Sequence, residues 1–110
     1  MSYDDALAAR VRAMAAERPD VAERAMFGGL AFMVGGNLAC CVLGEDLLVR
    51  LAPEEAEAAL GEPGVAPFGM PGRRPMRGFV RVDGAAVGAD ADLASWFDAA
   101  VAFAGALPGK

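Results

Sequence analysis

Basic and aromatic side chains form a candidate interaction patch in this sequence. Its members are Arg50, Arg73, Arg74, Arg77, Phe79 and Arg81. Four of these arginines lie within nine residues, from 73 to 81, and no acidic residue separates them. A guanidinium group binds planar oxyanions such as phosphate and carboxylate. Arg77, Phe79 and Arg81 alternate along a predicted strand, so they are expected on one face, where the ring could stack a nucleic-acid base. Arg50 joins this face if its strand is a neighbour.

Three interpretations of this patch are open. The arginines contact an anion or a nucleic acid, they contact an acidic protein partner such as part of the transcription machinery, or they pair with nearby acids and keep the strand from aggregating. Phosphate contacts dominate non-specific nucleic-acid affinity, and the net charge of the chain is −5. The overall charge therefore disfavours nucleic acid, although a local basic patch can override it, and a protein partner is expected.

The sequence contains no histidine, which removes the commonest general base, most nucleophile pairs and most zinc sites. Cys40 and Cys41 are adjacent, so on a strand they point to opposite faces and are expected to be two buried thiols in a reducing compartment. The remaining carboxylate cluster is expected to be a solvated helix face: Glu54, Glu55, Glu57 and Glu62. No catalytic residue, metal ligand or cofactor is therefore predicted, and the chain is not expected to be an enzyme.

Two Gly-Gly pairs occur in the stretch MFGGLAFMVGGN, at 28–29 and 35–36. A glycine loop that binds phosphate needs a helix directly after it, so that free backbone N–H groups point at the anion. A strand-like run follows each pair instead, and neither pair belongs to a known nucleotide-binding pattern. Gly35 and Gly36 therefore predict a two-residue hairpin turn, and Gly28 and Gly29 a second tight turn or a bulge.

The apolar spacing predicts the elements that position these residues. In order they are a helix over 3–17, four strands within 24–51, a short helix over 53–60, a Gly- and Pro-rich loop over 61–75, a strand over 76–82 and a helix from residue 90 onward. This α-β4-α-β-α order indicates the α+β class, with a single antiparallel sheet of about five strands flanked by N- and C-terminal helices. Trp96 keeps the spacing of the last helix and is expected in the core.

The 110 residues are expected to form one domain, 1–110. The N-terminus is no signal peptide and no apolar run is long enough to cross a membrane, so a soluble, cytoplasmic protein is expected. The usage of alanine, arginine and glycine is typical of a GC-rich bacterial genome. The runs LAFMV and LACCVL are apolar on both strand faces, so the second face is covered either by the long loop or by another subunit. A homodimer is predicted from this pattern.

Several segments together resemble the N-terminal domain of the TfoX/Sxy family. They are MFGGLAFMVGGNLACCV, DLLVRL, Pro53-Glu54, GRRPMRGFVRV and a C-terminal helix ending in ALPGK. The resemblance runs from about Asp4 to Lys110, and its most specific parts are MFGG and the block from Arg74 to Val80. It implies a five-stranded antiparallel sheet with flanking helices, and it supplies no catalytic residues.

Full-length members of this family regulate competence for DNA uptake and carry a second, helical domain, which is not expected in this sequence. The resemblance therefore implies a stand-alone domain that acts by protein–protein contact in transcription or competence-type gene regulation. Two alternatives come from the residues. Direct nucleic-acid binding through the segment 73–81 predicts affinity that falls steeply with salt. A small-molecule or enzymatic site that uses the loop 61–77 predicts a concave pocket there, with convergent polar groups.

Overall fold

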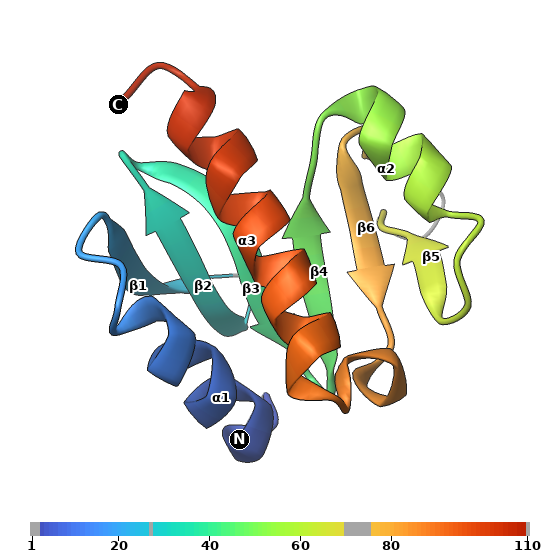
Figure 1. Ribbon diagram of the computed structural model, residues 1–110, viewed down its shortest axis with the longest axis horizontal. Coiled ribbons are helices and arrows are strands. Elements are labelled where there is room, and N and C mark those ends of the chain that lie inside the picture. Colours follow the sequence, from blue (N-terminus) through green and yellow to red (C-terminus); the bar gives the residue numbers. More distant parts are fainter. Residues whose placement is uncertain (1–2, 27, 70–75, 110) are drawn as a thin grey trace.

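The structure, a computed structural model, describes residues 3–26, 28–69 and 76–109. Its elements are, in chain order, α1 (Asp5–Ala15), β1 (Val21–Met26), β2 (Gly29–Val34), β3 (Asn37–Leu43), β4 (Asp46–Arg50), α2 (Pro53–Ala59), β5 (Val65–Pro67), β6 (Phe79–Val82), the 3-10 helix η1 (Gly84–Val87) and α3 (Asp90–Ala106). The three α-helices lie on one face of a single sheet, and α3 crosses the central strands (Figure 1).

The sheet has six strands in the order β1-β2-β3-β4-β6-β5, and every neighbouring pair is antiparallel. The predicted α+β class with flanking terminal helices is confirmed, with one strand more than the expected five. The extra strand, β5, lies within the segment that composition assigns to a loop. It pairs with β6 in the register Val65↔Val82, and Pro67 stands at the sheet edge, where a missing backbone N–H costs little.

The turn between β2 and β3 is the two-residue hairpin turn that the second glycine pair predicts. Gly35 and Gly36 have φ angles of 59° and 83°, and the residues on either side, Val34 and Asn37, face each other across the ladder. Positive φ at both positions fits a type I′ turn, which only glycine adopts without strain. Because β3 and no helix follows the turn, the glycines present no helix N-terminus to a phosphate.

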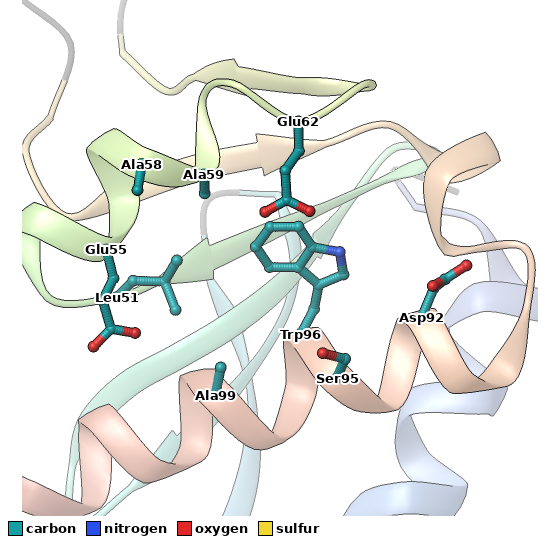
Figure 2. A pocket seen from close by; sticks show the side chains of 9 residues that line it. All are labelled: Leu51, Glu55, Ala58, Ala59, Glu62, Asp92, Ser95, Trp96 and Ala99. Carbon is teal, nitrogen blue, oxygen red and sulfur yellow. The ribbon is translucent and has the colours of Figure 1, made fainter.

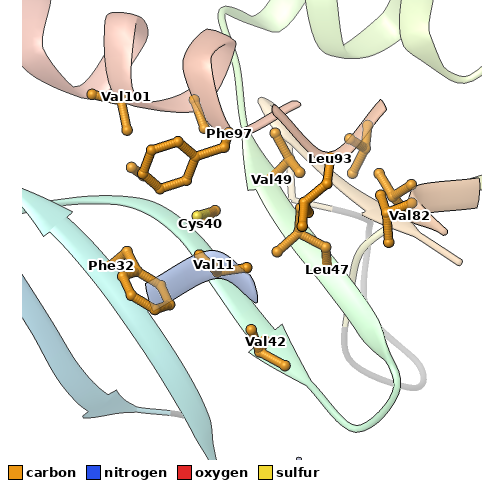
Figure 3. Close-up of a cluster of buried hydrophobic side chains, with 14 of the residues drawn as sticks. Val11, Phe32, Cys40, Val42, Leu47, Val49, Val82, Leu93, Phe97 and Val101 are labelled. Atoms are coloured by element: carbon orange, nitrogen blue, oxygen red, sulfur yellow. The ribbon is translucent and has the colours of Figure 1, made fainter. Parts of the chain in front are cut away.

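The main core lies between the helices and the inward face of the sheet. Phe97 and Leu93 of α3 reach down to Cys40, Leu47 and other inward residues of the central strands (Figure 3). These α3 side chains are buried because they recur at helical spacing on the side that meets the sheet. Each fully buried side chain of this size stabilises the fold by about 1.5–3 kcal/mol relative to its exposed state.

The outward face of the sheet holds a second apolar cluster. Its buried members are Ala31, Met33, Leu38, Cys41 and Leu48, none more than 9% exposed. Phe68, which follows β5, and Phe79 of β6 pack against them. The sequence leaves two ways to cover this second apolar face, the long loop or another subunit. Phe68, which belongs to the predicted loop, is one of the side chains that cover it. The predicted homodimer rested on an uncovered face; no observation tests it, and it stays a prediction.

A change of Phe97, which is 1% exposed, to Ala should lower the free energy of unfolding by about 3–5 kcal/mol, because the residual cavity adds to the lost burial. Urea melts monitored by circular dichroism measure the loss. The matched control is Ala102→Ser, at an exposed position of the same helix, which should stay within about 0.5 kcal/mol of the wild type. Equal losses in both variants would contradict the placement of the core.

Candidate functional site

The predicted patch of arginines and one phenylalanine is only partly assembled. Arg73 and Arg74 lie outside the residues that the structure describes. Phe79 belongs to β6, but Arg77 lies in the turn before it, so the strand predicted over 76–82 is shorter at its start. β6 pairs with β4 in the register Arg50↔Phe79, and Arg50 therefore lies beside this face, as expected for neighbouring strands.

Arg50 lies between two aromatic rings. Its guanidinium carbon is 5.5 Å from the ring centroid of Phe79 and 5.7 Å from that of Phe103 on α3. Both distances fall within the range in which a cation is attracted by the ring quadrupole. Arg50 therefore connects α3 with β6 through its contacts to one ring on each element. Its charge is already stabilised by these two aromatic rings of the same chain.

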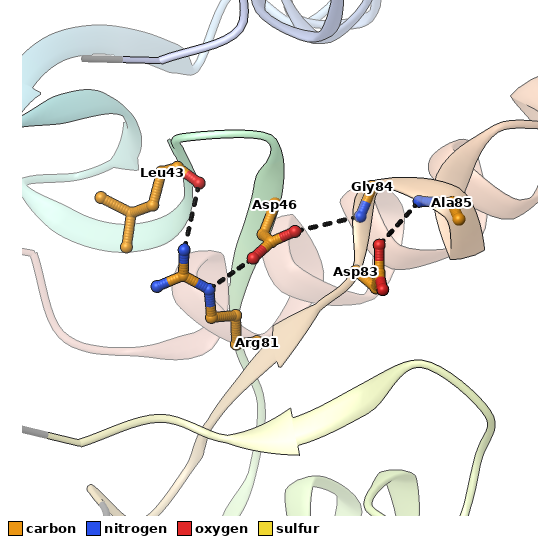
Figure 4. A network of polar contacts seen from close by, with 6 residues as sticks. All are labelled: Leu43, Asp46, Arg81, Asp83, Gly84 and Ala85. Atoms are coloured by element: carbon orange, nitrogen blue, oxygen red, sulfur yellow. Dashed lines mark hydrogen bonds and ion pairs between the residues drawn. The ribbon is translucent and has the colours of Figure 1, made fainter.

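Arg81 is engaged with an acid of the neighbouring strand. Its Nε donates a hydrogen bond to Oδ2 of Asp46 at 2.7 Å, and its Nη2 donates to the carbonyl of Leu43 at 3.5 Å (Figure 4). The other oxygen of Asp46 accepts the backbone N–H of Gly84 at 3.2 Å. For Arg81, this geometry matches the interpretation that the arginines pair with nearby acids, and it leaves the side chain little freedom to bind an external anion.

The arginines of the N-terminal segment are also paired. The ion pairs are Arg10–Asp90 at 3.0 Å, Arg12–Glu23 at 3.0 Å and Arg18–Asp98 at 3.5 Å. They join α1 and the residues after it to α3 and β1, and they are solvent-exposed, so each is worth less than about 1 kcal/mol. Within the described parts of the chain, the arginines without an ion pair are Arg24, Arg50 and Arg77. Four of the seven arginines in the described residues are thus paired with acids of the same chain.

Within the described residues, the acids of α2 and of the turn after it form no ion pairs. The segment from Pro53 to Glu62 carries four glutamates and no lysine or arginine. Pro at the first helical position and acids in the first turn favour this helix, because they suit the unpaired N–H groups and the dipole at its start. Its inward residues, Ala56 and Ala59, are small and buried, so α2 lies close to the sheet. The backbone of α2 therefore presents exposed glutamates that have no ion pair among the described residues.

A groove of about 360 Å³ separates α2 from α3. Apolar side chains line its lower part, among them Leu51, Ala59 and Ala99. The indole of Trp96 stands in the groove, and the carboxylate of Glu62 points toward it (Figure 2). Trp96 is only partly buried, because it lies at the margin of the α3 stripe, packing on the core with one side and lining the groove with the other. Trp96 was expected in the core, and the structure places it at the edge of the core, partly exposed to the groove.

Three carboxylates line this groove, namely Glu55 and Glu62 from the α2 side and Asp92 from α3. Sequence reasoning assigned the two glutamates to a solvated face and did not single out Asp92. In the described structure none of the three forms an ion pair. The sequence does show a run of glutamates with no lysine or arginine among them, which could have indicated an acidic surface. That Glu55 and Glu62 line a groove with Trp96 becomes visible only when α2 lies beside α3.

A smaller hollow of about 220 Å³ lies on the other flank of α2, near the start of β6. Leu60 and Met76, which are 39% and 44% exposed, line it together with Phe79. Glu57 and Arg77 are its charged residues. The described part of the segment 61–77 therefore borders a mainly apolar hollow rather than a site of convergent polar groups. This arrangement gives the small-molecule alternative little support.

Both cysteines are buried, with Cys40 in the main core and Cys41 in the outward cluster, as their adjacency predicts. Burial raises the pKa of Cys40 strongly, and it raises the pKa of Cys41 to about 11. Since the thiolate is the reactive form, both are weak nucleophiles at neutral pH. Among the described residues there is no group of three or more His, Cys, Asp or Glu side chains placed to hold a metal ion.

Residues 13–104 match the model of the TfoX N-terminal domain. The chain belongs to this family. The match contains all six strands, α2 and most of α3, so the predicted arginine patch and the α2–α3 groove lie within the matched residues of the TfoX N-terminal domain. The resemblance read from the sequence is confirmed. No curated protein and no solved structure matches the chain. No helix in the described part of this TfoX domain has both the length and the apolar character needed to span a bilayer.

The pairing of Arg81 can be tested by stability. Arg81→Ala should lower the free energy of unfolding by about 1 kcal/mol, because the partly buried Asp46 loses a charge-assisted hydrogen bond. Arg77→Ala removes the same charge from an exposed turn and should change stability by less than about 0.5 kcal/mol. Urea melts of Arg81→Ala, Asp46→Ala and Asp46→Ala/Arg81→Ala give the coupling energy, and a coupling near zero would count against the pair.

The buried thiols should make stability fall at alkaline pH. After unfolding they ionise more easily than in the folded chain, so the unfolded state loses its protons first. The free energy of unfolding should therefore be constant below about pH 8 and fall as the pH rises toward 11. Urea melts across this range measure the fall. In Cys40→Ala/Cys41→Ala the fall should be smaller, whereas an unchanged slope would show that other groups cause it.

Proposed function

We propose that this TfoX N-terminal domain is non-catalytic and acts by contact with another protein, in gene regulation of the transcription or competence type. The observation that carries the proposal is the α2–α3 groove, in which a partly exposed tryptophan stands among carboxylates that form no ion pair with any described residue. Tryptophan is enriched among the residues that dominate binding energy at protein interfaces, especially inside concave, well-packed sites. Trp96 has both the residue type and the setting of such an anchor.

The chemistry of the chain supports a binding role more than a catalytic one. A sequence without histidine lacks the usual proton carrier at neutral pH. The thiols of Cys40 and Cys41 are buried with raised pKa values, so neither is available as an activated nucleophile. The burial of the outward sheet face within the chain itself supports assigning the proposed protein contact to the α2–α3 groove instead of that face.

Photo-crosslinking in cells of the source organism tests the contact. Benzoylphenylalanine is placed at Ala58 or at Ser95, which line opposite sides of the groove, and the control position is Ala102, exposed elsewhere on α3. We expect the same polypeptide to be captured from both groove positions and not from the control, and its capture to fall at least fivefold when Trp96 is changed to Leu. The absence of any crosslinked polypeptide from the groove would contradict the proposal.

The regulatory part of the proposal is tested by RNA sequencing. Transcript levels that change on deletion of the gene should be restored by the wild type and by Glu54→Gln, but not by Trp96→Leu. If deletion leaves transcripts unchanged, the regulatory role is wrong. Direct nucleic-acid binding predicts a different result, namely salt-sensitive anisotropy with labelled DNA or RNA that Arg77→Ala abolishes. That outcome would replace protein contact as the function.

A further inference from the structure

We infer that the α2–α3 groove binds a basic segment of the protein partner, with an arginine side chain stacked on Trp96 between the carboxylates of Glu55, Glu62 and Asp92. This inference rests on the proposed function and adds the chemistry of the partner to it. The bound group is a guanidinium with at least one further cation nearby, presented by an extended stretch of polypeptide.

The charge of the groove selects a cation. Three carboxylates line it, no lysine or arginine does so, and none of the three acids is paired in the described structure. Arginines of α1 and of the turn after it pair with other acids of α3 instead, Arg10 with Asp90 and Arg18 with Asp98. An arginine brought in from outside would therefore meet three acids that line one groove and have no ion-pair partner among the described residues.

The shape of the groove favours arginine over a compact ammonium ion. A guanidinium is planar, so it can stack on an aromatic face and at the same time donate hydrogen bonds from its edge to carboxylates. Trp96 supplies the face and Glu62 points toward it (Figure 2). The apolar residues below, Leu51 and Ala99, suit the methylene groups of the arginine stem.

The length of the groove favours a segment of a protein over a free amine. Asp92, Trp96 and Ala99 follow one another at helical spacing along α3, a rise of about 10 Å. Glu55 and Asp92 lie on opposite sides of the indole (Figure 2). A single cation beside Trp96 leaves at least one of these carboxylates unpaired, whereas alternating arginines on an extended chain reach both ends.

The fluorescence of Trp96 reports binding directly, because it is the only tryptophan of the chain. The probe is an acetylated and amidated peptide in which arginine alternates with alanine, and its control carries neutral citrulline at each arginine. Titration of the full chain at physiological salt should give a saturable fluorescence change with the arginine peptide. The citrulline peptide should bind at least tenfold more weakly.

A matched pair of variants separates the groove from the general acidity of the chain. Glu55→Gln/Glu62→Gln should weaken binding of the arginine peptide at least tenfold. Glu54→Gln/Glu57→Gln removes the same amount of charge from α2 at positions outside the groove lining, and should change binding less than twofold. Trp96→Leu, measured by calorimetry, should weaken binding about fivefold, and circular dichroism shows that each variant is folded.

Three outcomes would overturn the inference. They are no saturable change at millimolar peptide, equal weakening by both glutamate pairs, and binding of arginine amide alone as tight as that of the peptide. If the peptide fails but a polypeptide is still crosslinked from Ala58 and Ser95, the inference is wrong and the proposed function stands. If the peptide binds as expected but nothing is crosslinked in cells, the groove recognises arginine and the proposed function is wrong.

Discussion

The central strands carry apolar side chains on both faces, and the need to keep both faces from water governs the rest of this structure. The helices pack on the inward face, around Leu93 and Phe97, and the outward face is covered with the help of Phe68 and Phe79. A chain of this size buries roughly two thirds of its extended surface, so few residues remain to cover two apolar faces of one sheet. Arg50, between an aromatic ring of the outward cluster and one of α3, joins the two covers at the end of β4.

Most of the fold could be predicted because its signals are local. The hairpin at Gly35 and Gly36 is encoded by two residues that alone tolerate the required φ angles, and the helices by spacing and by Pro53. β5 could not be predicted, because its residues lie between glycines and prolines and favour no regular structure by themselves. Its strand conformation depends on backbone hydrogen bonds with β6, which become available only after the sheet has assembled.

The candidate site was harder to predict because it depends on which charges meet. The sequence places Arg81 in a basic cluster, but its partner Asp46 lies 35 residues away and becomes a neighbour only through the pairing of β4 with β6. Helical periodicity assigns Trp96 to the buried side of α3. It does not show that α2 covers only part of the indole, which therefore also lines the groove. The glutamates of α2 look like an ordinary solvated face until α3 lies beside them. Because several arginines are paired and the acids of the groove have no ion pair among the described residues, the acids are the better candidates for contact with a partner.

Between Leu51 and Gly78 the chain forms α2 and the edge strand β5 and then returns to the end of β4. The N–H of Leu51 donates to the carbonyl of Gly78 at 2.7 Å, where β4 ends and β6 is about to begin. Because the entropy of closing a loop rises only slowly with its length, insertions or deletions in the parts of this excursion outside α2, β5 and Phe68 should cost the sheet little, provided that the closing contact is kept. α2 is carried by the excursion, while α3 belongs to the frame. One wall of the groove can therefore diverge among relatives while the opposite wall stays constant, which is a simple route to new specificities on an unchanged scaffold.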